Sequence, residues 1–553
     1  MKEGILLTFL FCTVLSAQEM GGRYLIITDD LFYDAIQPLA NWKHRMGLRT
    51  KVVKLSQIGS TTGAIKGYVD NAYDTWQIRP EFLLLVGSPG HIPFYVFSTY
   101  CYSDNYYTNM DFDIYNEILS GRLTVHTVTE AQTVVNKILL YEKTPDLTDS
   151  LWFINACLIA NEEEWTYPPP YWSDDSIYWS DVLHAKAYML ANGYNTIDTL
   201  SKLLGDNNNT VINRVNQGRA FVLYRGCAFN QWAWPFEVDA SQIQNGAKLP
   251  IVLSITCGTL GTGYTPAIVE RWFTTGTPTL PRGGAGYFAT TTSGYDIAHL
   301  RSAVCKGFFD ALFGQGKQTF GEACEGGRTN VYNMYNSSDE YRGFTTVGDP
   351  SMMIWTAVPK PLEVHHDSAL SVEDESLVVS VLCQDVPLES ALVCVVLDTV
   401  VYDYGHTGSD GEIVFNFDEL IPGNMHITVT ARNKIPFLDS ITVGPPGINE
   451  TAWVTTVPVS RIEVWPNPFT VQTQIRYPIL DAGYLIQDQK LVIYDASGRR
   501  VRSLNLESGI EHQESVFSWD GTDDDGRKLP GGVYLLNLDG PTCSRAIPVV
   551  LMR

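Results

Sequence analysis

Residues 221–227 (FVLYRGC) and 251–258 (IVLSITCG) each hold a short apolar run that ends at a glycine and a cysteine. Runs of this length are typical of strands buried on both faces of a parallel sheet. Thirty positions separate Cys227 from Cys257, which is enough for one crossover connection, so the two strands are expected to be neighbours. Functional side chains gather beyond the carboxyl ends of parallel strands, which makes this pair of cysteines a candidate site.

The same alternation of short apolar runs with helical patterns extends in both directions from these strands. Apolar runs at Tyr24–Thr28 and Phe82–Val86 alternate with helical patterns at Leu31–Met46 and Thr61–Trp76, and the alternation begins again at Trp152–Ala160. Strands that alternate with helices predict a parallel sheet covered on both faces. We therefore expect two α/β units side by side, over residues 18–147 and 148–357.

The pattern changes after the second unit. Residues 358–445 contain short alternating runs separated by turn sequences, which is typical of an Ig-like β-sandwich. A linker is expected at 446–458, and a second sandwich over 459–553. The expected fold class is thus α/β, with two parallel-sheet units followed by two all-β sandwich domains.

Composition excludes several functions. Of 553 residues, 45% are hydrophobic and 12% aromatic, so several cores can form. Thirty-eight Lys and Arg against 61 Asp and Glu give a net charge of −23. Such a chain repels phosphate backbones, which excludes general nucleic-acid binding.

The start of the chain has the pattern of a secretory signal peptide over residues 1–17. Lys2 precedes an apolar run at Ile5–Leu15, and small residues lead to a predicted cleavage after Ala17. No later stretch approaches about eighteen consecutive apolar residues. We therefore expect a secreted or cell-surface protein without a membrane span.

Cysteine pairing has two open alternatives at the candidate site. Adjacent strands lie about 4.8 Å apart, within the range that a disulfide tolerates, so Cys227 and Cys257 form either a disulfide or two separate thiols. Cys383 and Cys394 in the Ig-like module likewise form either a pair or two core residues. An acidic stretch, Asp523–Asp525 with Asp520, fails the spacing of a calcium loop and predicts a hairpin turn.

A series of short motifs lies between Tyr24 and Trp355: Leu84–Gly87 with Ile92-Pro93, Ser103-Asp104, Gly121-Arg122, Asn136-Lys137, Leu249-Pro250, Thr256-Cys257 and Gly348–Ser351. In this order they resemble the motifs of the gingipain-type cysteine peptidases, which have a caspase-like fold. Residues from Pro359 resemble the Ig-like module that follows the catalytic unit. Trp465–Phe469 and Trp519–Gly521 are similar to the C-terminal domains of type IX secretion, which implies that the secretion machinery is a partner.

The resemblance implies nucleophilic chemistry on a protein or peptide substrate. Cys257 occupies the place of the nucleophile, and the backbone N–H groups of Cys257 and Ala228 would form the oxyanion hole. Cys227 occupies the place of the general-base histidine. Glu162 is a candidate for orienting an imidazole, and His299, in the loop after the next strand, is a candidate base.

Two functions follow from this site. One is a cysteine endopeptidase, and the other is a catalytically inactive pseudopeptidase that acts as a secreted binding or structural protein. No cofactor is expected; the resemblance allows structural calcium without locating it. A carboxylate within Ser176–Asp181 is the region to search for substrate selection, and Trp232, Trp234 and Trp272 either line an apolar cleft or belong to the core.

Overall fold

The structure is a computed structural model that describes residues 18–111, 113–162, 172–262, 266–445, 463–465, 467–477, 490–495, 499–505, 515–539 and 547–552. The chain forms two compact units that divide after Thr455. The predicted signal peptide and the predicted linker lie outside the described residues. None of the helices in the described ranges combines the length and the hydropathy that crossing a bilayer requires.

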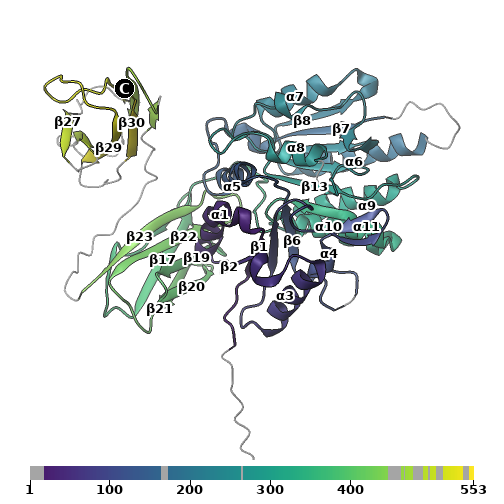
Figure 1. The fold of residues 1–553 in the computed structure, drawn as a ribbon, viewed down its shortest axis with the longest axis horizontal. Coiled ribbons are helices and arrows are strands. Elements are labelled where there is room, and N and C mark those ends of the chain that lie inside the picture. Colours follow the sequence, from purple (N-terminus) through teal and green to yellow (C-terminus); the bar gives the residue numbers. More distant parts are fainter. Residues whose placement is uncertain are drawn as a thin grey trace, which may run out of the picture. The chain divides into compact units, whose positions relative to one another are not determined.

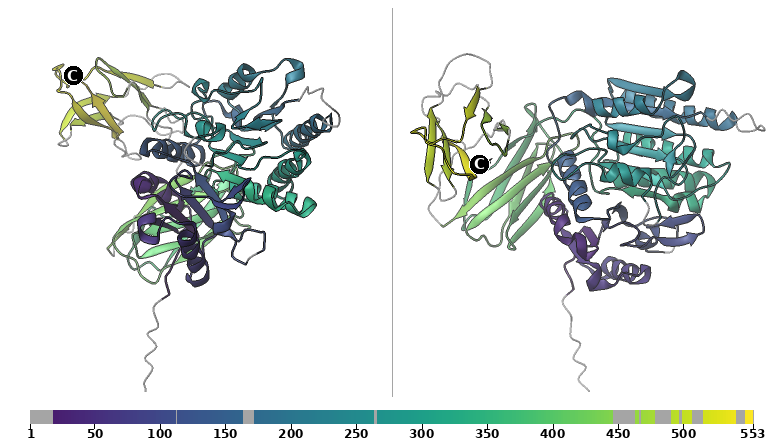
Figure 2. Two further views of the ribbon diagram at one scale, coloured as in Figure 1. Left: turned by 45° about the vertical axis from the view of Figure 1, so that its right-hand side comes forward. Right: turned by 45° about the horizontal axis from the view of Figure 1, so that its top comes forward.

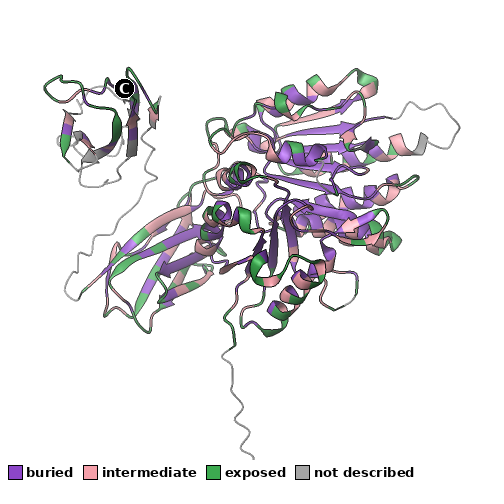
Figure 3. Ribbon diagram, viewed as in Figure 1, coloured by how far each residue is buried: buried purple, intermediate pink, exposed green. Residues whose placement is uncertain are grey.

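The first unit contains a ten-stranded sheet (Figure 1). Its strands, in spatial order, are β2 (Thr50–Lys54), β1 (Tyr24–Thr28), β3 (Phe82–Val86), β6 (Leu119–Leu123), β14 (Phe344–Val347), β13 (Gly286–Thr290), β12 (Ile251–Ile255), β9 (Phe221–Arg225), β7 (Asn155–Ala160) and β8 (Thr196–Ser201). Most of these strands are buried along their whole length, as Figure 3 shows. Burial on both faces explains why they are continuous apolar runs.

The two predicted α/β units are the two halves of this one sheet. All neighbours from β2 to β14 are parallel, and all neighbours from β13 to β8 are parallel. The halves meet where β13 and β14 pair antiparallel. Because the halves therefore run in opposite directions, their carboxyl ends lie at opposite edges of the sheet.

Helices cover both faces of the sheet (Figure 2). The helical segments are η1 (Asp30–Phe32), α1 (Tyr33–Arg45), α2 (Leu55–Ile58), α3 (Thr62–Thr75), α4 (Asn105–Thr108), α5 (Val128–Glu142), η2 (Ser150–Ile154), α6 (Trp172–Ala191), η3 (Lys202–Leu204), α7 (Asn208–Gln217), η4 (Ala240–Gln242), α8 (Ile268–Thr274), α9 (Ala298–Phe309), η5 (Asp310–Gly314), α10 (Phe320–Tyr335) and α11 (Ser338–Gly343). Successive residues of β13 show the two layers: Tyr287 packs on Trp272 of α8, and Phe288 packs on Phe308 of α9.

Two short hairpins lie outside the large sheet. They are β4 (Tyr95–Ser98) with β5 (Cys101–Ser103), and β10 (Ala228–Phe229) with β11 (Gln231–Trp232). Tyr102 of β5 accepts a hydrogen bond through its carbonyl from Thr291 Oγ1 at 2.7 Å, just beyond β13. The β4–β5 hairpin of the first half thus reaches the edge at which the strands of the second half end.

The predicted Ig-like module follows as two packed sheets. One sheet contains β15 (Glu363–His365), β17 (Ser376–Cys383), β18 (Val386–Pro387) and β21 (Glu412–Asn416); the other contains β16 (Ala369–Ser371), β23 (Phe437–Gly444), β22 (Gly423–Thr430), β19 (Leu392–Leu397) and β20 (Val401–His406). Alternate residues of both sheets form one core. The module packs on α1, where Tyr402 donates a hydrogen bond to the carbonyl of His44 at 3.0 Å.

The second unit is also strand-rich. Its two sheets contain β24 (Glu463–Trp465), β25 (Thr473–Tyr477) and β28 (Ser515–Trp519), and β27 (Arg500–Asn505), β26 (Lys490–Asp495), β29 (Gly532–Asp539) and β30 (Ile547–Leu551). Trp519 is at the centre of its core, between Phe469 and Tyr534. The Asp523 carboxylate accepts hydrogen bonds from the amides of Asp525 and Arg527, which is a turn, as predicted.

Candidate active site

Cys257 and Cys227 lie side by side at the carboxyl ends of two adjacent strands. The parallel register of β9 and β12 ends with Arg225 opposite Ile255. Beyond it, Thr256 Oγ1 donates to the Gly226 carbonyl at 2.5 Å, and the Asn230 amide donates to the Gly258 carbonyl at 3.0 Å. These two contacts flank the cysteines and hold the loops together. Cys227 is exposed and Cys257 is partly exposed.

Gly226 permits the sharp turn that precedes Cys227. Its φ is +155°, and a Cβ at this position would lie 2.7 Å from the Cβ of Asn161 and 3.0 Å from the Asn161 carbonyl oxygen. Any other residue would collide with the end of β7. The glycine in FVLYRGC therefore keeps the loop after β9 close to the sheet.

The polar partner of Cys257 is an arginine from α9. Arg301 Nη1 lies 2.7 Å from the Cys257 sulfur, and the Gly294 carbonyl oxygen lies 3.8 Å from it. Arg301 Nε lies 3.3 Å from Glu340, and Nη2 donates to the Thr292 carbonyl at 3.2 Å. A guanidinium held on two sides in this way presents its remaining edge to the sulfur.

The charge of Arg301 is stable in this buried position. Burial disfavours the cation, but Glu340 and the Cys257 sulfur outweigh burial and raise the pKa of Arg301 above its ordinary value. A fixed cation beside a thiol favours the thiolate, which is the nucleophilic form. The arrangement therefore supplies part of what an imidazolium supplies in a cysteine–histidine pair.

A second buried arginine positions both partners of this contact. Arg225, at the end of β9, forms an ion pair with Asp181 of α6 at 2.6 Å. The same guanidinium donates to the carbonyls of Ile255 and Ala298. Ile255 is two residues before Cys257, and Ala298 is three residues before Arg301. Asp181 is thus a structural group, and it is buried, so it does not select substrates through an open pocket.

Glu270 anchors the loop that follows Cys257. Its carboxylate accepts hydrogen bonds from the amides of Gly261 at 3.0 Å and Ala267 at 2.6 Å. Burial raises the pKa of Glu270 to about 7, against the opposing effect of these amides. The ionisation of this one side chain is therefore coupled to the conformation of the loop beside the nucleophile.

The histidine prediction is wrong in its local structure. His299 lies in the first turn of α9 rather than in a loop, and its ring packs on Tyr335 at 5.1 Å. Arg301, two residues later, lies about 200° around the helix axis and contacts Cys257 instead. Within the described part of the chain, no imidazole contacts the Cys257 sulfur.

The opposed directions of the two half-sheets place two of the other histidines in the described α/β residues away from Cys257. His91 follows β3 and His126 follows β6, so both lie at the edge opposite Cys257. His44 packs on Tyr402, and His184 pairs with Asp310 at 2.7 Å.

Glu162 lies at the same edge, after β7, but β9 separates it from the strand that carries Cys257. Its carboxylate is buried. It accepts hydrogen bonds from Trp179 Nε1 at 2.8 Å, Ser201 Oγ at 2.6 Å and the Lys202 amide at 3.1 Å. These donors give Glu162 a role in joining β7, α6 and β8.

The cysteine alternatives have a clear outcome in this structure. Cys257 is a free thiol, so the disulfide to Cys227 is not formed. Cys383 and Cys394 are also free, and they lie on different sheets of the Ig-like module rather than on neighbouring strands. Ala228, the second predicted oxyanion donor, lies in β10 opposite Trp232. Its part in an oxyanion hole stays a prediction.

The three tryptophans do not share one environment. Trp232 stacks on Tyr224 and Trp272 packs on Tyr287, so both belong to the core. Trp234 is 68% exposed on the loop after β9, and Tyr295 is 96% exposed on the loop after β13. Trp234 follows the β10–β11 hairpin, where Lys202 Nζ lies 5.2 Å from the centre of its ring, and Tyr295 is next to Gly294, whose carbonyl oxygen lies 3.8 Å from the Cys257 sulfur.

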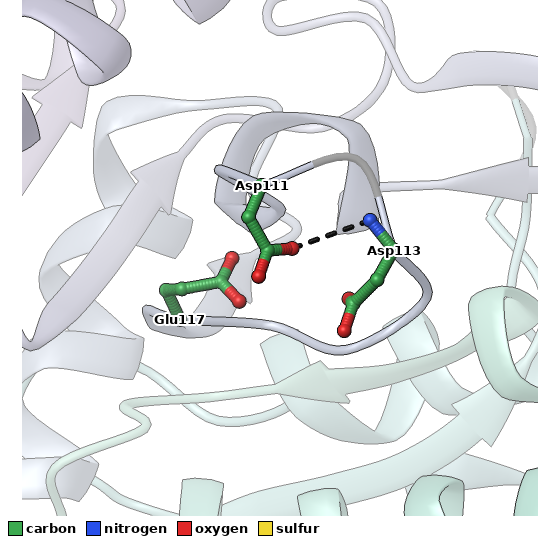
Figure 4. Close-up of side chains that lie close together, drawn as sticks. All are labelled: Asp111, Asp113 and Glu117. Atoms are coloured by element: carbon green, nitrogen blue, oxygen red, sulfur yellow. Dashed lines mark hydrogen bonds between the residues drawn. The ribbon is translucent and has the colours of Figure 1, made fainter.

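An acidic cluster lies apart from this site, in the loop between α4 and β6 (Figure 4). One carboxylate oxygen from each of Asp111, Asp113 and Glu117 lies within 4.8 Å of the others. The Asp113 amide donates to Asp111 at 3.2 Å, and the Met110 amide donates to Glu117 at 2.6 Å. These backbone contacts are those of an acidic surface turn, and we assign no metal to it.

Comparisons with known proteins identify the scaffold. Residues 17–355 match the family model "Peptidase family C25", and residues 486–541 match "FlgD Ig-like domain". Gingipain R2 of Porphyromonas gingivalis is 23% identical over 527 residues, which cover 91% of this chain and 66% of that protein. Gingipain R1 of the same species is 24% identical over 383 residues, which cover 66% of this chain and 37% of that protein. The chain thus spans just under two thirds of the first relative and about a third of the second.

Solved structures confirm the caspase-like α/β fold. The Arg-specific cysteine proteinase gingipain R matches with a TM-score of 0.68 at 22% identity, covering 77% of this chain and 99% of that one. The complex of RgpB pro- and mature domains gives the same TM-score at 21% identity, covering 76% of this chain. Because the family model spans well over half of its residues, the chain belongs to peptidase family C25.

Proposed function

We propose that the chain is a secreted cysteine endopeptidase in which Cys257 attacks the carbonyl carbon of a protein or peptide substrate. The observation that carries the proposal is the contact between Arg301 and a partly exposed cysteine sulfur at the carboxyl edge of the sheet. A thiolate stabilised by a cation is a competent nucleophile at neutral pH.

The residues around Cys257 support the two steps of acylation unequally. These steps are the attack on the carbonyl carbon and the protonation of the leaving amine. In the proposed reaction, the Cys257 sulfur attacks the carbonyl carbon with the Arg301 guanidinium 2.7 Å away, in place of a base. The leaving amine must be protonated, however, and a guanidinium does not give up its proton near neutral pH. Water is then the proton donor. We therefore expect activated esters to acylate Cys257 much faster than amides, which need that proton. No step of the proposed reaction uses a cofactor.

Substrate contact is proposed for the two exposed aromatic side chains. Trp234, in the loop after β11, and Tyr295, in the loop after β13, present apolar surface to solvent. Exposed aromatic groups around a reactive side chain are typical of binding sites. Alanine at either position is expected to raise KM for peptides and leave kcat nearly unchanged, in steady-state assays; an unchanged KM in both variants would exclude this role.

The second candidate is a pseudopeptidase that acts as a secreted binding or structural protein. It is favoured by one observation, which is that Cys227 stands where the family resemblance places the general base. A thiol is mostly protonated at neutral pH and, once ionised, attacks rather than shuttles protons.

One experiment separates the two candidates. The mature protein is incubated under reducing conditions with a peptide library, an activated ester and a thiol-directed acylating probe, beside Cys257→Ala. Peptide cleavage that Cys257→Ala loses supports the endopeptidase. Labelling of Cys257 with no peptide cleavage supports the pseudopeptidase. A folded protein whose Cys257 is not labelled would contradict the nucleophile assignment itself.

Export and surface location are proposed from the ends of the chain. The leader pattern at 1–17 supports passage across the inner membrane, and the strand-rich second unit is proposed to engage type IX secretion machinery. Deleting residues 459–553 is expected to retain the protein in the periplasm, as measured by cell fractionation. Normal release of the truncated protein would contradict that role.

A further inference from the structure

The thiols at the carboxyl edge of β9 and β12 are the most oxidant-accessible ones on the α/β sheet. Cys227 is exposed and Cys257 is partly exposed, whereas Cys101, Cys157, Cys305 and Cys324 are buried. Burial raises the pKa of both Cys101 and Cys324 to about 12. Oxidants react with thiolates, so these buried thiols are protected, and a soluble oxidant is directed to the edge of the sheet.

Arg301 makes the two edge cysteines unequal. Its Nη1 is 2.7 Å from the Cys257 sulfur, and the guanidinium is held in place by Glu340 and Thr292. Cys257 therefore has a fixed cation beside it, which is the environment of a cysteine that reacts with peroxides. Cys227 follows the adjacent strand β9, which makes it the candidate for a second cysteine that attacks an oxidised Cys257.

The backbone allows the two sulfurs to be joined. The last paired residues of β9 and β12 are Arg225 and Ile255, and neighbouring strands lie about 4.8 Å apart. Cys227 and Cys257 come two residues after this pair. The contacts from Thr256 to Gly226 and from Asn230 to Gly258 keep the loops adjacent past those positions. Disulfides span about 4.4–6.8 Å between Cα atoms, and the spacing of adjacent strands lies within this range.

We propose that Cys257 and Cys227 form a peroxide-reactive dithiol, in which a hydroperoxide oxidises Cys257 first and Cys227 then closes a reversible disulfide. The pair is a site of oxidation distinct from peptide cleavage, and its chemistry does not depend on whether Cys257 also hydrolyses peptides. Where it does, the disulfide blocks the nucleophile, and oxidation becomes the off state of the enzyme.

The reaction balances in two steps. The Cys257 thiolate attacks the terminal oxygen of a hydroperoxide, the O–O bond breaks, and the released alkoxide takes a proton from water, which leaves a sulfenic acid on Cys257. The Cys227 sulfur then attacks the Cys257 sulfur, the S–O bond breaks, and water leaves with the Cys227 proton. Overall, two thiols are oxidised to a disulfide and one hydroperoxide is reduced to an alcohol and water.

The test uses the full mature chain, fully reduced and then treated with one equivalent of hydrogen peroxide or an organic hydroperoxide. Non-reducing peptide mapping should find the peptides of Cys227 and Cys257 linked, and dithiothreitol should separate them. In Cys227→Ala, dimedone should trap the sulfenic acid on Cys257. Arg301→Gln should slow the oxidation of Cys257 about tenfold, the effect of one unit charge 2.7 Å away at the dielectric constant of water.

Matched controls make each outcome decisive. Cys383→Ala removes a partly exposed thiol of the Ig-like module and should leave the linked peptide and its rate unchanged. The proposal is overturned if no peptide links the two cysteines, if Cys227 is oxidised in Cys257→Ala as fast as Cys257 is in Cys227→Ala, or if Arg301→Gln, folded by circular dichroism, oxidises at the native rate. Peptide cleavage is assayed separately, so its absence contradicts only the proposed function.

Discussion

Replacing Glu270 with glutamine should make the free energy of unfolding of the protein less sensitive to rising pH. The buried carboxylate has its pKa raised to about 7 by burial, from an ordinary value of 4.5. A carboxyl whose pKa is higher in the folded state binds its proton more tightly there than in the unfolded chain. Its contribution is therefore fully present below pH 4.5 and is lost as the pH rises through 7.

The magnitude follows from the size of the shift. About 2.5 pKa units at about 1.36 kcal/mol each correspond to roughly 3 kcal/mol of unfolding free energy, lost between about pH 4 and pH 8. Glutamine keeps an oxygen for the amides of Gly261 and Ala267 but carries no charge. The free energy of unfolding of Glu270→Gln minus that of the native protein should thus rise by roughly 3 kcal/mol across this range.

Urea unfolding followed by tryptophan fluorescence at several pH values measures this difference, since Trp272 lies in the same helix as Glu270. Contributions from other titrating groups cancel between the two proteins. Glu81 provides the control, because its carboxylate is exposed and pairs with Arg23 at 2.7 Å; Glu81→Gln should give a difference that changes by at most about 1 kcal/mol, the contribution of an exposed ion pair. A difference for Glu270→Gln that is equally flat would refute the argument that burial of this carboxyl dominates.

Three further predictions concern the scaffold and the nucleophile. Lys43→Met should lower the free energy of unfolding of the first unit by about 3–5 kcal/mol. The reason is that the buried carboxylates of Glu142 and Asp349, which lie 2.5 and 2.6 Å from Lys43 Nζ, lose their cation. Chemical denaturation measures this loss, and a value below about 1 kcal/mol would contradict the prediction. Gly226→Ala should lower the melting temperature and the alkylation rate of Cys257 together, since its Cβ would collide with Asn161; a native alkylation rate would show that the loop accommodates it. Arg301→Lys should alkylate at a rate between native and Arg301→Gln, because lysine keeps the charge but cannot also hold Glu340 and Thr292; iodoacetamide kinetics at neutral pH test this, and a rate equal to that of Arg301→Gln would refute it.

Much of the fold was predictable because its strands and helices follow from local hydrophobic patterns in the sequence. Continuous apolar runs mark the strands of the large sheet, and alternating runs with turns mark the sandwiches. Neither pattern predicts β14, because its four residues, FTTV, are too few and too polar to indicate a strand. Yet β14 joins the two halves, and its antiparallel pairing with β13 places the ends of the halves at opposite edges.

The sequence by itself determined the layered α/β scaffold, the two sandwiches and the position of Cys257 at a strand end, because each depends on residues close together in the chain. Only the tertiary structure decided what surrounds that sulfur. Arg301 is 44 residues away in sequence and Glu340 is 83, and neither has a local signal. They meet Cys257 because α9 and the residues before β14 converge on the edge where β12 ends, which is a property of chain topology and not of any one segment.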